Sequence, residues 1–182
     1  MAAIKPIAGT RINLRPLVAA DAVSIHKYAR HREICRYTFL PYPYSRRHAD
    51  EWVITSSERN RSGLDFNMGI ELPETGEVIG MISLNNIDHF NRHAELGYWL
   101  GKPFWGHGYV SEAIGLIVAH GFRQIKLKRI YARVMHPNKT SAHLLEKCGF
   151  TYEGTLRRQI KRNGRYLDEL RFGLLLEEWR SE

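Results

Sequence analysis

The stretch YWLGKPFWGHGYVSEAIGLIVAHGF, residues 98–122, places two glycines around a histidine where an apolar segment passes into a helical pattern. One face of that helix is apolar at i, i+3, i+4, i+7, i+8 and i+11, namely Val110, Ala113, Ile114, Ile117, Val118 and Gly121. Gly106-His107-Gly108 therefore precede a helix N-terminus, where free backbone N–H groups collect. These residues alone fit either a phosphate cradle or a tight turn. Their spacing matches neither the dinucleotide-binding fingerprint nor the P-loop.

Segments on both sides of this stretch predict a mixed order of strands and helices. Asp21 and Ser45 are suited to cap two early helices. Gly149 is suited to end a later helix, and Asn163-Gly164 to turn a closing hairpin. Two prolines make residues 37–44 loop-like. The expected order is strand (10–17), helix (21–30), helix (from 45), strands (64–71, 77–85, 92–100), helix (from 109), strand (129–135), helix (138–148) and strands (155–161, 166–176).

The segment from Glu95 to Met135 has the order strand, helix, strand. Such a unit implies a parallel pair with a right-handed crossover, here inside an otherwise antiparallel sheet. Ligands of such sheets bind outside the carboxyl ends of the parallel strands. The Gly106–Gly108 turn lies at that end, so the sequence predicts a ligand site there.

Length and composition limit the class of protein. No repeat or linker divides the 182 residues, so residues 1–182 are expected to form one domain. Cys35 and Cys148 lack metal-ligand spacing, and we expect no metal site. No leader-like segment and no run of about 18 apolar residues occurs, so we expect a cytoplasmic protein without membrane association. The net charge of +8 favours anionic partners such as phosphorylated cofactors, acidic substrates or nucleic acid.

Three segments in this order resemble the GNAT superfamily of acetyl-CoA-dependent N-acetyltransferases, and within it the RimJ/RimL type. They are AELGYWLGKPFWGHGYVSEA, HPNKTSAHLLEKCGF and NGRYLDELRFGLLLEEW, and the resemblance extends from INLRPL to LLLEEW. It implies an α/β (α+β) fold with a mixed, mostly antiparallel sheet. A central parallel strand pair would splay around the cofactor, and helices would cover both faces. The reaction implied is acetyl transfer to a primary amine.

The resemblance also implies where acetyl-CoA binds. The pyrophosphate would be held by the backbone amides of Trp105, Gly106, His107, Gly108 and Tyr109. Asn138 would hydrogen-bond the pantetheine arm, next to Ser141, and an amide near Trp99 or Leu100 would stabilise the oxyanion. The family loop often begins with Gln or Arg. Here Pro103 takes that place, which removes one side-chain contact but leaves the backbone amides.

Acetyl transfer from a thioester needs a neutral amine, a stabilised oxyanion and a protonated or tolerated thiolate. Glu95 shares a strand face with Gly97 and Trp99 by alternation, and family members use a carboxylate here as base, directly or through water. The alternative is an exposed strand residue or one paired with Arg92 or His93.

The general acid is less directly indicated. Many family members carry a tyrosine seven residues after the helix asparagine, and Leu145 stands there. Ser141, one turn after Asn138, is a candidate partner of the thiolate, against simple solvation of the helix. Cys148 lies where a small apolar residue commonly packs, so we expect direct transfer in a ternary complex rather than an acetyl-cysteine.

The acceptor groove is expected between the first two helices and the closing hairpin. Its candidates are the segment 85–91 and the aromatic residues Tyr37, Phe39, Tyr42 and Tyr44. The resemblance implies the N-terminal α-amine of a protein, with ribosomal proteins as known targets of this type; relatives acetylate polyamines or aminoglycosides. A basic tail would need local acids, and the candidates are Glu33, Glu51 and Asp88. Both a monomer and a homodimer stay open.

Two non-catalytic alternatives remain at this point. A basic run around the final hairpin is typical of phosphate-backbone contacts and would suit an RNA- or ribosome-binding module; it comprises Arg157, Arg158, Lys161, Arg162 and Arg165. Salt-dependent RNA binding without cofactor binding would favour that module. A coenzyme-A-sensing relative would bind the cofactor and turn over no amine.

Overall fold

The computed structural model describes residues 4–162 and 164–180. One eight-stranded sheet has the order β1-β2-β3-β4-β5-β6-β8-β7, and β5–β6 is its parallel pair. The predicted mixed, mostly antiparallel sheet is thereby confirmed. The strands are β1 (Ile7–Ala8), β2 (Asn13–Arg15), β3 (Phe66–Glu71), β4 (Val78–Asp88), β5 (His93–Leu100), β6 (Arg129–Met135), β7 (Thr151–Arg162) and β8 (Arg165–Leu175).

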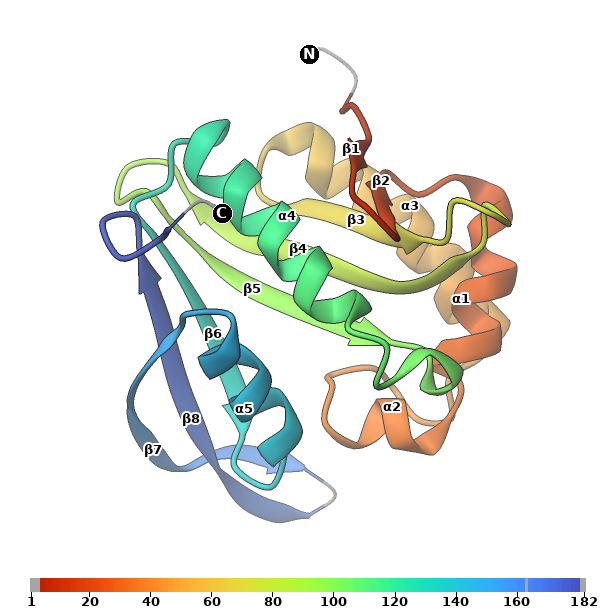
Figure 1. Cartoon of the computed structure of the whole chain (residues 1–182). Coiled ribbons are helices and arrows are strands. Elements are labelled where there is room, and N and C mark those ends of the chain that lie inside the picture. The colour runs from red at the N-terminus through yellow and green to blue at the C-terminus, as the bar shows by residue number, and fades with distance from the viewer. Residues whose placement is uncertain (1–3, 163, 181–182) are drawn as a thin grey trace.

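Helices cover both faces of the sheet, as expected. In Figure 1, α4 and α5 lie in front of the sheet and α1 and α3 behind it. A large apolar core forms under α4 and α5, and a second cluster forms under α1 and α3. The helices are α1 (Ala22–Ala29), α2 (Arg32–Arg36), α3 (Arg46–Ser62), α4 (Tyr109–Arg123) and α5 (Lys139–Lys147), with short 3-10 turns η1 (Ala19–Asp21) and η2 (Lys102–Phe104).

Local sequence accounts for most helix ends. Ser45 caps α3 by accepting the backbone N–H of His48 at 3.3 Å, and Gly149 follows α5 with φ +88°, both as predicted. Asp21 is the N-cap residue of α1, but the prediction that its side chain caps the helix is wrong. Its carboxylate accepts the N–H of Val18 at 2.7 Å and makes no cap hydrogen bond to α1, because Arg15 draws it back toward β2.

Two elements were not expected from sequence, namely β1 and α2. Each is short, two and five residues, so neither has a periodic pattern long enough to recognise. The predicted Asn163-Gly164 turn falls partly outside the described residues, which do not include Asn163. The two strands that it was expected to join, β7 and β8, pair antiparallel.

The parallel strands stop pairing before they end. The last paired residues are Leu96 and Ala132, but β5 continues to Leu100 and β6 to Met135. Figure 1 shows the two strands diverging toward the ends that lead into η2 and α5. The backbone along this edge of β5 therefore has no neighbouring strand. This divergence places a gap in the middle of the sheet.

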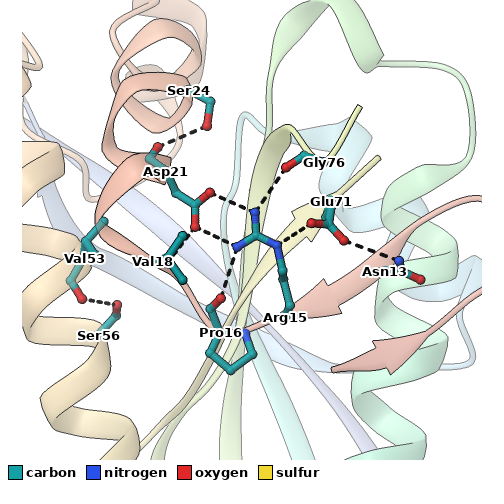
Figure 2. A network of polar contacts seen from close by, with 10 residues as sticks. All are labelled: Asn13, Arg15, Pro16, Val18, Asp21, Ser24, Val53, Ser56, Glu71 and Gly76. Atoms are coloured by element: carbon teal, nitrogen blue, oxygen red, sulfur yellow. Dashed lines mark hydrogen bonds and ion pairs between the residues drawn. The ribbon is translucent and has the colours of Figure 1, made fainter. Parts of the chain in front are cut away.

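One arginine ties the N-terminal elements together (Figure 2). Arg15 on β2 donates to both carboxylate oxygens of Asp21, at 2.7 and 2.8 Å, and to Glu71 on β3. It also donates to the carbonyl of Gly76 in the β3–β4 turn, at 3.2 Å. The hydrogen bonds that Arg15 donates to Asp21 and, with a smaller effect, to Glu71 raise the pKa of Arg15, although burial opposes them. Only 17% of the Arg15 side chain is exposed, so this network joins the sheet to α1 at a mostly buried point.

We predict that Arg15→Met lowers the free energy of unfolding by about 3 kcal/mol, because it leaves two poorly solvated carboxylates without a cation. Urea unfolding followed by circular dichroism measures this. The exposed Arg30 at the end of α1 is a matched control, and Arg30→Met should change stability by less than about 0.5 kcal/mol. Equal effects of the two variants would contradict a central role for the Arg15 network.

Candidate active site

The free edge of β5 presents backbone groups to the gap. Backbone N–H groups along a strand point alternately to its two edges. Gly101 donates to Ile79 at 2.8 Å, toward β4, so the N–H groups of Leu100 and Tyr98 point toward the gap. Of the two amides that we expected near the oxyanion, Leu100 and not Trp99 thus has the right direction. The Leu100 carbonyl is occupied, since it accepts the indole Nε1–H of Trp105 at 2.7 Å.

The glycine turn lies at the end of the same gap and leads into α4. Gly106 and Gly108 have φ values of +81° and +78°, which favour glycine, and Gly108 is the N-cap of α4. Within the part of the chain that the structure describes, the backbone N–H groups from Gly106 to Tyr109 have no hydrogen-bond acceptor. A Cβ at Gly106 would meet nothing within 4 Å. The turn therefore offers open backbone donors at a helix N-terminus, as an anion cradle requires.

Arg11 supports this turn, a contact that the sequence did not suggest. Its Nη1 donates to the carbonyl of His107 at 2.7 Å, and its guanidinium lies 5.5 Å from the ring of Tyr109. Glu112 in the first turn of α4 accepts the Nε–H of Arg11 at 3.0 Å and its backbone N–H at 2.8 Å. Burial opposes ionisation of Glu112, but these donors outweigh it and lower its pKa. About 100 residues separate the partners, so no local pattern could reveal them.

A pair of hydroxyls lies on the α4–α5 side of the sheet. The Asn138 side chain caps α5 by accepting the Ser141 N–H at 3.3 Å. The Ser141 hydroxyl lies 2.7 Å from Tyr98 Oη on β5, so this hydrogen bond connects α5 to β5. Burial raises the pKa of Tyr98 to about 12, which keeps its hydroxyl protonated. The alternation along β5 places Tyr98 on the opposite face from Glu95, and this much is visible in the sequence, whereas the contact with Ser141, 43 residues away, is not.

Glu95 lies on the opposite side of the sheet, facing α1 and α3. It accepts the Nε–H of Arg133 on β6 at 2.8 Å, and 13% of its side chain is exposed. The partners expected for an ordinary surface residue, Arg92 or His93, do not pair with it; His93 lies 3.8 Å from Asp88. Glu95 is therefore a fixed, mostly buried carboxylate.

Gly97 lies two residues along β5 from Glu95, on the same face. A Cβ there would lie 2.9 Å from the Nδ2 of Asn85 and 3.3 Å from the Oγ of Ser83 on β4. Glycine thus allows these polar side chains to approach the strand beside Glu95. The surface of the sheet beside the Glu95 carboxylate is consequently polar.

The aromatic residues expected to line the acceptor groove are only partly exposed. Phe39 and Tyr42 are 63% and 59% exposed, but Tyr44 is buried and packs in the second core cluster. Arg162 on β7 holds this loop, since it donates to the carbonyls of Cys35 at 2.6 Å and Leu40 at 3.1 Å. One residue of the basic run therefore has a structural partner. The loop and the closing hairpin meet beside the Glu95 face, where the acceptor groove was expected.

The three acids expected to shape the groove have local partners. Glu33 accepts a hydrogen bond from the Lys102 ammonium at 2.6 Å. Within α3, Glu51 accepts a hydrogen bond from the Arg47 guanidinium at 2.6 Å. Asp88 accepts the backbone N–H groups of residues 90 and 91 at 2.9 and 2.7 Å. These hydrogen bonds lower the pKa of Glu33 and of Asp88. All three carboxylates are engaged in local contacts, which weakens their expected role as receptors for a cationic acceptor.

The remaining candidates have limited chemistry. Burial raises the pKa of Cys148, which favours the protonated thiol over a nucleophilic thiolate. Within residues 4–162 and 164–180, no group of three or more His, Cys, Asp or Glu side chains is placed to bind a metal. In the same ranges, no helix combines the length and the apolar character needed to span a bilayer.

Comparison with known proteins identifies this arrangement. Residues 11–151 match the model of the acetyltransferase (GNAT) domain family. A Bacillus subtilis protein provisionally named a ribosomal N-acetyltransferase, YdaF, is 37% identical over 124 residues, which are 67% of each chain. The spermidine N(1)-acetyltransferase of Escherichia coli is 27% identical over 172 residues, 94% of this chain and 89% of that protein.

A solved structure agrees with the family match. The microcin C7 self-immunity acetyltransferase MccE, in complex with acetyl-CoA and AMP, superposes with a TM-score of 0.82 at 25% identity and covers 91% of this chain and 93% of its own. The open cradle before α4 and the gap between β5 and β6 fit an elongated, anionic cofactor of this kind. The chain belongs to the GNAT family and is an acetyl-CoA-dependent N-acetyltransferase.

Proposed function

We propose that the chain acts as a single catalytic domain that acetylates the N-terminal α-amine of a protein by direct transfer in a ternary complex. The observation that carries the proposal is the gap between β5 and β6, with the Leu100 amide at its edge, Ser141 on one side and Glu95 on the other. The resemblance to YdaF supports a ribosomal protein as acceptor. We place the enzyme in the cytoplasm, in at least transient contact with ribosomes.

The cofactor residues proposed are those that the sequence suggested, with one exception and one addition. The free amides of Gly106, His107, Gly108 and Tyr109 would bind the pyrophosphate, whereas the N–H of Trp105 already donates to the carbonyl of Lys102 at 3.2 Å. Arg11 would hold the turn in place. Asn138 would contact the pantetheine arm from the start of α5. When bound, acetyl-CoA supplies the acetyl group as an activated thioester.

The transfer needs three contributions from the chain. Glu95 would accept a proton from the acceptor amine, directly or through water, so that the nitrogen has a free lone pair for the new carbon–nitrogen bond. The Leu100 N–H would donate a hydrogen bond to the carbonyl oxygen of the thioester, where negative charge develops. The Ser141 hydroxyl would donate a hydrogen bond to the sulfur, which leaves as the thiolate. An α-amine has a pKa of about 8 and is therefore more easily deprotonated by a weak base than a lysine side chain is.

Tyr98 completes the Ser141 site. The family tyrosine is replaced by Leu145, which is buried and has no hydroxyl. Tyr98 reaches Ser141 from β5 instead, and its high pKa keeps it a hydrogen-bond donor throughout the usual pH range. We propose that Tyr98 positions the Ser141 hydroxyl and does not itself contact the leaving sulfur.

A polyamine acceptor is less well supported, although spermidine acetyltransferases are relatives. A polyamine carries several positive charges and needs several available carboxylates. On the Glu95 side of the sheet, carboxylates already have arginine partners: Glu95 with Arg133, Glu169 with Arg171 and Glu153 with Arg129. Family membership also sets aside the non-catalytic RNA-binding module as the main function.

Gly106→Ala tests the cradle. The added methyl group enters the open space before α4, so acetyl-CoA should bind about tenfold more weakly in isothermal titration calorimetry. Gly76→Ala in the β3–β4 turn is the matched control, since its φ is +68° and its Cβ would also meet nothing within 4 Å. Both variants should lose about 1 kcal/mol of stability from backbone strain. Equal affinities for acetyl-CoA in both variants would place the pyrophosphate elsewhere.

Glu95→Gln tests the base and the reaction. Thiol release from acetyl-CoA should occur with peptides that begin with Ala, Ser or Met, and kcat should fall about 100-fold in Glu95→Gln with unchanged cofactor affinity. Glu58→Gln, an exposed residue on α3, is the control and should behave as wild type. Turnover only with polyamines or aminoglycosides would reject the protein acceptor. Cofactor binding without turnover of any amine would support a sensing role.

Tyr98→Phe tests the hydroxyl pair. It should lower kcat about fivefold, with KM for acetyl-CoA nearly unchanged, because Ser141 loses its hydrogen-bond partner. The double variant with Ser141→Ala should lose no more than Ser141→Ala alone, since the two residues act as a unit. Tyr166→Phe, exposed on β8, is the control. Additive losses in the double variant would show that Tyr98 acts independently of Ser141.

A further inference from the structure

Four charged side chains form a connected row on the acceptor side of the sheet. Glu95 on β5 contacts Arg133 on β6 at 2.8 Å, and Arg133 Nη1 lies 3.9 Å from Glu169 on β8. Arg171 on β8 lies 2.7 Å from the other oxygen of Glu169. The row thus runs from the proposed base away from the gap, across three strands.

The two arginines are held side by side. Arg133 and Arg171 are directly opposite in the β6–β8 register, so their side chains lie on the same face. The carboxylate between them, Glu169, is 1% exposed, whereas the arginine side chains are 32% and 31% exposed. A buried carboxylate therefore lies beside two guanidinium groups that reach solvent, 2.7 Å from one and 3.9 Å from the other.

Both guanidinium groups keep free donors. Among the described residues, the hydrogen bond that Arg133 makes uses Nε, and the contact of Arg171 with Glu169 also uses Nε. The terminal nitrogens of both arginines are not hydrogen-bonded to that part of the chain. A guanidinium presents its terminal N–H groups as a planar fork that fits a carboxylate or phosphate. The ring of Phe39, 5.6 Å from the Arg133 guanidinium, borders this position.

Resting on the proposed function, we infer that Arg133 and Arg171 form an anion subsite and that the acceptor amine carries a carboxylate a few bonds away. Glu95 and Arg133 are in direct contact, so a group bound to Arg133 lies close to an amine bound at Glu95. We assign the carboxylate to an acidic side chain near the N-terminus of the acceptor protein; a free acidic amino acid has the same chemistry.

Charge balance supports this acceptor class. The formal charges of Glu95, Glu169, Arg133 and Arg171 cancel. An ammonium group that approaches Glu95 competes with Arg133 for this carboxylate and weakens the Glu95–Arg133 ion pair. A carboxylate on the same acceptor molecule then pairs with Arg133 in place of Glu95. A neutral acceptor offers no such replacement, and a cationic acceptor meets two guanidinium groups at short range. The same arginines thus select for one acceptor and against another.

The test uses peptides that begin with Ser and differ only in residue two, which is Asp, Asn or Lys, together with free aspartate and asparagine. Wild-type kcat/KM should be at least about tenfold higher for the Asp peptide than for the Asn peptide, and lower still for Lys. Arg171→Gln should abolish that preference, so that kcat/KM for the Asp peptide falls to the value for the Asn peptide in the same variant. Arg157→Gln, an exposed arginine on β7, should keep the preference.

Two further measurements separate the possible failures. Loss of Arg171 leaves a buried acid, so the double variant Arg171→Gln, Glu169→Gln repeats the test without an unpaired charge.

Binding of the same peptides without their α-amine, measured by calorimetry with coenzyme A present, measures the affinity of the anion subsite without catalysis. Preferential binding of the Asp form without turnover would reject the proposed function but support the subsite. Equal binding or equal kcat/KM of the three peptides would overturn the inferred anion subsite. A preference for the Asp peptide that persists in Arg171→Gln and in the double variant would overturn it as well. Preference for free aspartate over the peptides would support the subsite and replace the protein acceptor.

Discussion

The divergence of β5 from β6 is the constraint on which the site depends. Pairing ends at Leu96 and Ala132, and the following residues of β5 keep an edge with no strand beside it. Unpaired backbone groups inside a sheet require a partner, and a bound cofactor is one. The same divergence brings the start of α4 and the start of α5 to the two sides of one gap. The anion cradle and the proposed pantetheine and oxyanion sites therefore share a single structural cause.

The period of two along β5 separates the chemistry onto two faces of the sheet. Glu95 and Gly97 face α1 and α3, whereas Tyr98 faces α4 and α5 and meets Ser141. The proposed proton acceptor for the amine and the proposed hydrogen-bond donor for the sulfur therefore lie on opposite faces of the same strand.

Charge pairing explains how a strongly basic chain builds an acceptor site. Many carboxylates near the site are paired with arginine or lysine, so the excess of positive charge remains on the outer surface and on the partly exposed guanidinium groups. Glu95, the proposed base, pairs with Arg133 and not with a neighbour on its own strand. In our proposal this arginine favours acceptors that carry an anion close to the amine.

By itself the sequence determined the order of the elements other than β1 and α2, the parallel crossover, the glycine turn before α4 and the identity of Glu95, Asn138 and Ser141 as candidates. These features depend on local periodicity and on short motifs, which survive without knowledge of distant contacts. The tertiary structure alone decided that Arg11 supports the cradle, that Tyr98 meets Ser141 and that Glu95 pairs with Arg133. Each of these contacts joins residues 38 or more positions apart. Side-chain partners across strands depend on register and strand divergence, which no local pattern specifies.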